Sequence, residues 1–238
     1  MTHVRSLATV TCLTALVLAG SALGSRAATG TPQAGIIDEG AFRISRPGST
    51  APEVESFRIQ RGDNGQFIAT GRVIAGPHRV VSRLVADSDG APISYALDIF
   101  DNQARTSRVT AQAASGRLST VVSNRQGDES QRDYPIGREH AVLLDDELVH
   151  QMYFLRLTIR SGSVRVISPH AARTGTFVIS AHGLEPVDVG GQSVTATHFS
   201  LVNGGDRRDV WLDPEGRVLR AETSSGLKAV RDEVPRQR

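Results

Sequence analysis

The stretch Leu144–Leu155, Leu-Asp-Asp-Glu-Leu-Val-His-Gln-Met-Tyr-Phe-Leu, decides the expected fold, because it carries a helical pattern within a chain of strands and turns. Its apolar residues recur at steps of four, four and three, which places them on one face of a helix. These residues are Leu144, Leu148, Met152 and Leu155. A single apolar helix between two sets of strands predicts a mainly β fold. The expected form is an antiparallel meander, curved into a half-open barrel around one central helix.

Charged residues flank the expected helix in the order that a helix dipole favours. Asp145 and Asp146 stand at its N-terminal end, and Arg156 and Arg160 follow its C-terminal end. Asp145 could also accept a backbone N–H bond as an N-cap. Neighbouring helical residues point about 100° apart. We therefore interpret Asp145, Asp146 and Glu147 as capping charge and not as an acid–base pair for catalysis.

Strands are expected on both sides of this helix, because apolar and polar residues alternate between short turns. In Ile93–Phe100, for example, Tyr95, Leu97 and Ile99 share one face. Asp63-Asn-Gly65 predicts a hairpin turn, and Asp213-Pro-Glu-Gly216 predicts another. The pattern indicates roughly ten to twelve antiparallel strands. Leu157–Ile159 could extend the helix, but Thr158 and Ile159 favour a strand.

The first residues have the layout of a secretory signal peptide, with a basic start, an apolar run and small residues near a cleavage site. We assign 1–24 to this leader, 25–36 to a disordered tether, 37–232 to a single β-rich domain and 233–238 to a polar tail. The one cysteine, Cys12, lies in the leader, so the mature chain would have no thiolate or disulfide. No later segment is apolar enough to span a membrane. The predicted location is periplasmic or secreted.

The charge pattern argues against a nucleic-acid partner. The formal net charge is +2, and Lys228 is the only lysine. The arginines are scattered along the chain and not clustered, as on a solvated sheet face, so no basic patch is predicted. Examples are Arg43, Arg58, Arg72, Arg83, Arg108 and Arg117.

No local metal or catalytic motif is found. Of seven histidines, one belongs to the leader, and the others are His78, His140, His150, His170, His182 and His198. None forms a His-Glu-x-x-His or a close His pair, so neither a metal nor another cofactor is predicted. His78 is expected in a solvent-facing turn, and His150 at the boundary of the helix stripe. His182 and His198 could meet in space. A Gly-x-Ser-x-Gly elbow is also missing, and we expect no enzyme.

The closing segment Val210-Trp-Leu-Asp-Pro-Glu-Gly-Arg-Val-Leu-Arg, with the trailing Leu227-Lys-Ala-Val-Arg, looks like the final hairpin of certain exported bacterial proteins. Their fold is similar to that of the periplasmic lipoprotein carrier LolA. The resemblance implies a curved, incomplete barrel around a helical plug, whose concave side holds acyl chains. Aromatic residues make up only 5% of this chain, which departs from a lipid-carrier pattern.

These observations leave three functions open. The first is a non-catalytic carrier of a lipid or other apolar molecule, because a curved sheet around one helix leaves an interior that side chains or a ligand must fill. The second is an envelope structural or protein-interaction module, in which the same residues form a dry core, and the third is a hydrolase. The residues expected to line the interior are Phe57, Ile59, Tyr95, Leu97, Ile99, Leu148, Met152, Phe177 and Ile179.

Overall fold

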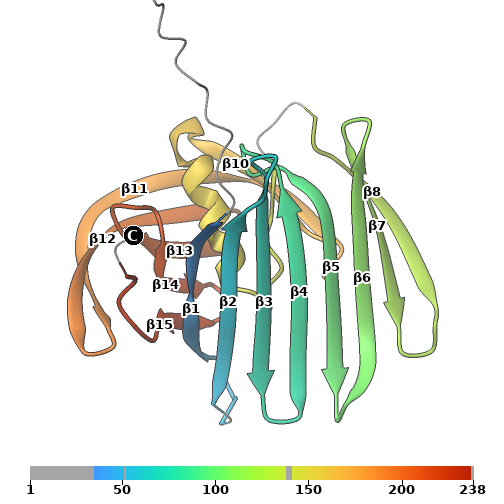
Figure 1. Ribbon diagram of the computed structural model, residues 1–238, viewed down its shortest axis with the longest axis horizontal. Helices are drawn as coiled ribbons and strands as arrows, with labels where there is room; N and C mark the ends of the chain where they lie inside the picture. The colour runs from blue at the N-terminus through green and yellow to red at the C-terminus, as the bar shows by residue number, and fades with distance from the viewer. Residues whose placement is uncertain (1–34, 51, 138–140, 237–238) are drawn as a thin grey trace, which may run out of the picture. The chain divides into compact units, whose positions relative to one another are not determined.

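The computed structural model describes residues 35–50, 52–137 and 141–236. Within them the chain forms one large sheet of 15 strands and one short helical segment (Figure 1). The predicted leader lies outside the described residues, as does most of the predicted tether. The first strand begins at Gly35, two residues before the expected domain boundary.

The mainly β prediction is confirmed, although the described residues hold more strands than the ten to twelve expected. The strands are β1 (Gly35–Ser45), β2 (Glu53–Arg61), β3 (Phe67–Ala75), β4 (His78–Ala86), β5 (Pro92–Asp101), β6 (Ala104–Ala114), β7 (Arg117–Asn124), β8 (Glu129–Pro135), β9 (Ala141–Leu143), β10 (Ser163–Ser168), β11 (Arg173–Val189), β12 (Gln192–Asn203), β13 (Asp206–Leu212), β14 (Val218–Thr223) and β15 (Lys228–Arg231).

The sheet is two meanders joined in the middle. Its strand order is β8-β7-β6-β5-β4-β3-β2-β1-β15-β14-β13-β12-β11-β10-β9, so the first and last strands of the chain pair with each other. Neighbours are antiparallel except β9 and β10, which are parallel. The three-residue β9 has no counterpart in the sequence prediction, because it is too short for alternation to show.

Alternation explains why each strand has one buried face. In β2, Glu55, Phe57 and Ile59 are buried, while the residues between them are exposed. The turn predicted at Asp63–Gly65 joins β2 to β3, and Gly65 has the positive φ of 79° that such a turn demands. The turn predicted at Asp213–Gly216 likewise joins β13 to β14, with a φ of 77° at Gly216.

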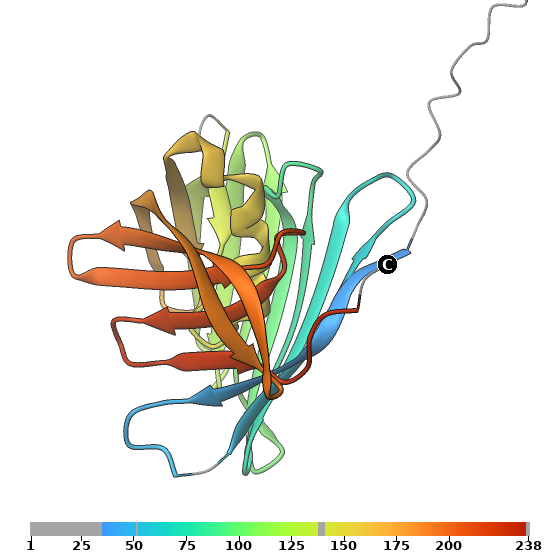
Figure 2. The same cartoon turned by 90° about the vertical axis from the view of Figure 1, so that its left-hand side faces the viewer.

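The central helix is a 3₁₀ helix, η1 (His150–Leu157), followed by the short η2 (Ile159–Ser161). Figure 2 shows it between the β10–β14 part of the sheet and the β2–β6 part. The predicted bounds were wrong at the start, because residues 144–149 form a loop with a turn at Asp146 and Glu147. Leu157–Ile159 is helical, so the strand favoured there was also wrong. In the described part of the chain, no helix is long and apolar enough to cross a bilayer.

Two cores hold the fold together. The main core lies on the inner face of the sheet around η1, where six consecutive residues, His150–Leu155, are all buried. This part of the helix therefore has no solvent-exposed face. The apolar stripe of Leu144, Leu148, Met152 and Leu155 had predicted burial on one side only. A smaller core lies on the other face of β13 and β14, where Trp211 and Leu219 pack with Val187 and Val189 from the end of β11.

Candidate functional site

The nine residues predicted to line an interior ligand site do come together in the main core. Eight are buried and belong to one cluster, and Ile179 is half-buried against it. The Phe57 ring stacks on Phe42, with ring centroids 5.0 Å apart. The alternation pattern therefore identified core positions correctly. That these residues also hold a ligand stays a prediction.

A buried contact between Glu55 and His150 fixes the start of η1. The Glu55 carboxylate on β2 accepts hydrogen bonds from the backbone N–H groups of Val149, at 2.7 Å, and His150, at 3.2 Å. The same carboxylate contacts Nδ1 of the His150 ring, and both side chains are fully buried. The prediction of His150 as a boundary residue was wrong, since it lies inside the core. Glu55 thus satisfies helix N–H groups that the sequence analysis assigned to Asp145.

Asp145 has a different role from the predicted cap. Its buried carboxylate accepts hydrogen bonds from the hydroxyls of Tyr95 and Ser168, each at 2.8 Å, and from the backbone N–H of His170. Burial raises the pKa of Asp145, although these three donors oppose the rise. Asp146 is exposed, and it pairs with Arg208 at 2.9 Å and with Arg173. The two carboxylates tie the turn before η1 to the strands around it.

The outer face of β1–β6, opposite to the core, gathers arginines that lie far apart in the sequence. Cross-strand register brings them onto one face with uncharged residues between them: Arg72 is opposite Ser56 and Val81, and Arg83 is opposite Thr70 and Ala96. We call this surface the arginine face. Its outward-facing charged residues are Arg43, Arg58, Arg72, Arg79, Arg83, Arg105 and Arg108, with Glu39 and Asp98. Arginines that are scattered in the sequence therefore share one outward face of the sheet.

A shallow groove of about 770 Å³ lies within the arginine face. Its walls come from β1–β5, and small or apolar residues such as Thr70, Gly71, Val81 and Ala96 form much of its lining. The arginines of this lining are Arg58, Arg72 and Arg83, and its carboxylates are Glu39 and Asp98. Phe57 is the one residue of the predicted ligand set that lines this groove.

The arginines of this face differ in how they are paired. Arg58 pairs with Glu39 at 3.2 Å, and Arg105 and Arg108 approach Asp98 at 3.5 and 3.7 Å. Among the residues that the structure describes, the guanidinium groups of Arg72 and Arg83 have no ion-pair or hydrogen-bond partner, and the Arg72 backbone oxygen accepts from Ser56. Two guanidinium groups are thus free to bind an anion beside small and apolar side chains. The sequence indicated this face in one way: along each strand the arginines alternate with the apolar residues, so they point to the other face of the sheet.

A ladder of planar side chains crosses the outer face of β11–β14. The rings of His182 and His198 lie 4.6 Å apart, as the sequence allowed, and His198 stacks on Trp211 at 4.3 Å. The Arg220 guanidinium covers the other side of Trp211 at 4.5 Å. Glu185 accepts from Trp211 Nε1 at 2.7 Å and lies 2.9 Å from His198 Nδ1.

This ladder brings a serine and a histidine together without completing a catalytic triad. Ser200 Oγ lies 2.7 Å from His182 Nε2, and Ser200 is buried. A triad needs a carboxylate on the other nitrogen of the same histidine. In the described contacts, the carboxylates of Glu185 and Asp209 bind His198 instead. We therefore interpret the ladder as a structural contact that links β11, β12, β13 and β14.

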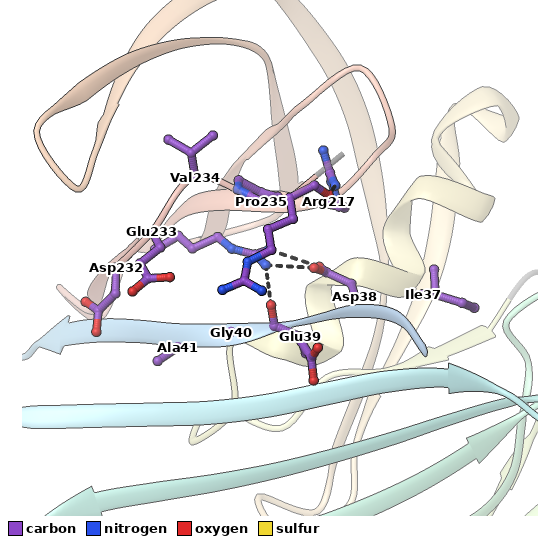
Figure 3. A pocket seen from close by; sticks show the side chains of 12 residues that line it. Ile37, Asp38, Glu39, Gly40, Ala41, Arg217, Asp232, Glu233, Val234 and Pro235 are labelled. Carbon is purple, nitrogen blue, oxygen red and sulfur yellow. Dashed lines mark hydrogen bonds and ion pairs between the residues drawn. The ribbon is translucent and has the colours of Figure 1, made fainter. Parts of the chain in front are cut away.

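A pocket of about 350 Å³ lies between β1 and the segment after β15 (Figure 3). Arg231 donates to both carboxylate oxygens of Asp38, at 3.0 and 2.7 Å, and Arg217 donates to Asp213 at 2.6 Å and to the backbone oxygen of Arg236 at 2.8 Å. Both guanidinium groups are already paired. The predicted polar tail contributes to this wall, and its Pro235 is buried.

The other histidines give no metal site. His78 is half-buried near Asp101, with 3.6 Å between Nδ1 and Oδ1, and His140 lies outside the described residues. In residues 35–50, 52–137 and 141–236, no three histidine, cysteine or acidic side chains are grouped so that they could hold a metal ion.

No family model matches the chain, and no curated protein matches its sequence. Among solved structures, the chain is similar to a crystal structure of a beta-barrel-like protein of domain of unknown function DUF1849 from Brucella abortus. The TM-score is 0.49 and the sequence identity 11%, over 82% of this chain and 95% of that chain.

Proposed function

We propose that the protein is a non-catalytic binding protein for an anionic amphipathic molecule, an alkyl chain that ends in a carboxylate or a phosphate. The groove on the arginine face is its binding site. The observation that carries this proposal is the position of Arg72 and Arg83, whose guanidinium groups have no described partner and which lie beside Val81 and Ala96 in the groove. This is the predicted apolar-ligand carrier with the site moved from the interior to the outer face.

The two parts of such a ligand match the two parts of the groove. A guanidinium binds carboxylate and phosphate through two parallel hydrogen bonds, which an exposed arginine without a carboxylate can offer at little cost. The alkyl chain would cover Val81, which is 39% exposed, and Ala96. Each Å² of apolar surface removed from water contributes about 25 cal/mol. Neither part alone gives high affinity, since an exposed ion pair is worth about 0–1 kcal/mol.

Isothermal titration calorimetry with three probes tests this proposal: decyl phosphate, the neutral decyl maltoside and inorganic phosphate, with the two decyl compounds below their micelle concentrations. We expect decyl phosphate to bind more tightly than either other probe. Arg72→Gln combined with Arg83→Gln should weaken its binding about tenfold or more, which corresponds to about 1.4 kcal/mol.

A matched control removes the same charge elsewhere. Arg125 and Arg160 are exposed and lie outside the arginine face, so Arg125→Gln with Arg160→Gln should leave the affinity unchanged. Met152→Trp fills space in the core and should not affect binding at the groove. Loss of binding in Met152→Trp, with normal binding in the Arg72 and Arg83 variant, would instead indicate the interior site.

Two sequence predictions stay open beside this proposal. The exported location predicted from residues 1–24 would place the groove where envelope lipids occur. The expected likeness to the lipoprotein carrier LolA carries no part of the proposal, which depends on the arginine face alone.

A protein-interaction module is the second candidate function. Val178 and Val202 are opposite each other on β11 and β12, with exposed fractions of 60% and 37%. An exposed cross-strand valine pair is what a protein contact would cover. Cross-linking from Val178 in cell envelopes tests this function: a discrete protein adduct would support it, and its absence would oppose it.

A further inference from the structure

We infer that the arginine face docks on a bilayer that contains anionic lipids, and that the molecule held in the groove is a lipid of that surface. The inference rests on the proposed function, because the groove lies within this face. It adds the partner: a membrane surface and not a free amphiphile in solution.

The first support is the charge of the whole face. Seven arginines and two carboxylates point outward from β1–β6, an excess of +5, whereas the chain as a whole carries +2. Counting Asp232, which pairs with Arg43 at 2.7 Å, still leaves +4. The arginine face is therefore more positive than the chain as a whole, and an anionic lipid surface attracts such a face over about one Debye length.

The second support is the set of exposed aliphatic side chains among these arginines. Val54 is opposite Ile74 on β2 and β3, and Val81 follows on β4. Their exposed fractions are 38%, 44% and 39%. Aliphatic groups between basic ones are typical of surfaces that bind at a membrane interface, where the apolar groups enter the headgroup region and the charges meet anionic headgroups.

The same side chains favour a bilayer over a nucleic acid. A basic nucleic-acid site uses exposed aromatic rings to stack bases. On this face Phe100 is covered by the Arg79 guanidinium at 4.1 Å, so its ring is already stacked. Contact with a phosphate backbone does not stabilise exposed valine and isoleucine side chains, whereas contact with lipid removes their apolar surface from water.

Access to the face is open in the described structure. η1 and the main core lie on the opposite side of β1–β6, so no element in the described part of the chain covers the arginine face (Figure 2). The strands lie side by side as one broad surface (Figure 1). A membrane could therefore contact all six strands together.

Vesicle co-sedimentation tests the charge requirement. We expect the protein to sediment with phosphatidylcholine vesicles that contain phosphatidylglycerol and to stay in solution with phosphatidylcholine alone. Arg72→Glu with Arg83→Glu should remove sedimentation, while the matched control Arg125→Glu with Arg160→Glu should keep it. Equal loss in both variants would mean that only net charge matters, and the docking face would be wrong.

A fluorescent label tests the orientation. Cys12 is the only cysteine, so a Cys12→Ser chain that carries Ile74→Cys can be labelled at one position with an environment-sensitive dye. We expect a blue shift on addition of anionic vesicles at position 74 and none at position 178, in the matched Val178→Cys chain. A shift at 178 alone would overturn the inference.

The outcomes separate this inference from the proposed function. Binding of decyl phosphate without any vesicle binding contradicts the bilayer only. Vesicle binding without decyl phosphate binding contradicts the groove site, and with it the lipid held there, but leaves the docking face. Equal binding to heparin or RNA, unaffected by Ile74→Ser and Val81→Ser, would identify a general polyanion surface and overturn the inference.

Discussion

Gly71 on β3 leaves the space in which the His150 ring lies, because a Cβ at residue 71 would overlap ring atoms Cε1 and Nδ1. The close approach of sheet and helix thus depends on a missing side chain. We predict that Gly71→Ala destabilises the protein by about 1–3 kcal/mol, the usual cost of overpacking a core. Urea unfolding measures this loss.

Gly205→Ala is the matched control, since nothing lies near its Cβ and Gly205 has no positive φ. It should change the free energy of unfolding by less than about 0.5 kcal/mol. Equal stability of the Gly71→Ala and wild-type proteins would show that η1 is not packed against β3 as described.

The buried Glu55 supplies a second prediction. Glu55→Ala leaves two backbone N–H groups and the buried His150 ring without their acceptor. We expect a loss of about 3–5 kcal/mol, because each buried polar group that is left without a partner costs about 1–3 kcal/mol. Glu215→Ala, which removes an exposed carboxylate near Arg217, should cost less than about 1 kcal/mol. Thermal unfolding measures the melting temperatures of the two variants. Equal melting temperatures would contradict the role of Glu55 in fixing the start of η1.

Asp145 gives a pH-dependent prediction. Because burial raises its pKa in the folded state, the folded protein binds the proton more tightly than the unfolded chain. Its contribution to stability therefore falls as the pH rises from the ordinary aspartate pKa through the raised value. Tyr95→Phe removes a donor to the charged carboxylate, so its cost, about 1–3 kcal/mol, should be larger at about pH 7 than at about pH 4. Urea unfolding at both pH values checks this, and a cost that does not depend on pH would contradict it.

Glu185 has a lowered pKa, in contrast to Asp145, and the Trp211 side chain that it contacts can report on its titration. Hydrogen bonds from Trp211 and, to a smaller extent, His198 lower the pKa of Glu185. The charged carboxylate therefore stabilises the folded state above the ordinary glutamate pKa, and this stabilisation is lost as the pH falls through the lowered value. Trp211 is the only tryptophan, and its emission should change at a pH below the usual glutamate range. Glu185→Gln does not titrate and should abolish most of that step. An unchanged step in this variant would assign it to another group.

The sequence was sufficient to predict the β class of the fold and the buried positions of most strands. Strict alternation places Tyr95, Leu97 and Ile99 on one face because a strand turns each side chain by half a revolution, and no tertiary contact changes that. The turns at Asp63–Gly65 and Asp213–Gly216 were also predictable, since glycine takes the positive φ they require.

The contacts between distant residues were not predictable in the same way. Whether Asp145 or Glu55 satisfies the first N–H groups of η1 depends on how β2 packs against that segment, 94 residues away for Val149. The arginine face depends on register across six strands. The outward position of each arginine was visible in the alternation, but the alignment that makes Arg72 a neighbour of Val81 was not.

Photo-crosslinking with a diazirine-bearing alkyl phosphate, followed by mass-spectrometric mapping, is the most direct test of the central claim. The account predicts labelling of outward residues of the groove, above all Thr70, Val81 and Ala96, and loss of that labelling in the Arg72→Gln and Arg83→Gln variant. Labelling of interior residues such as Leu148 and Met152 would contradict the outer site and support a ligand in the core.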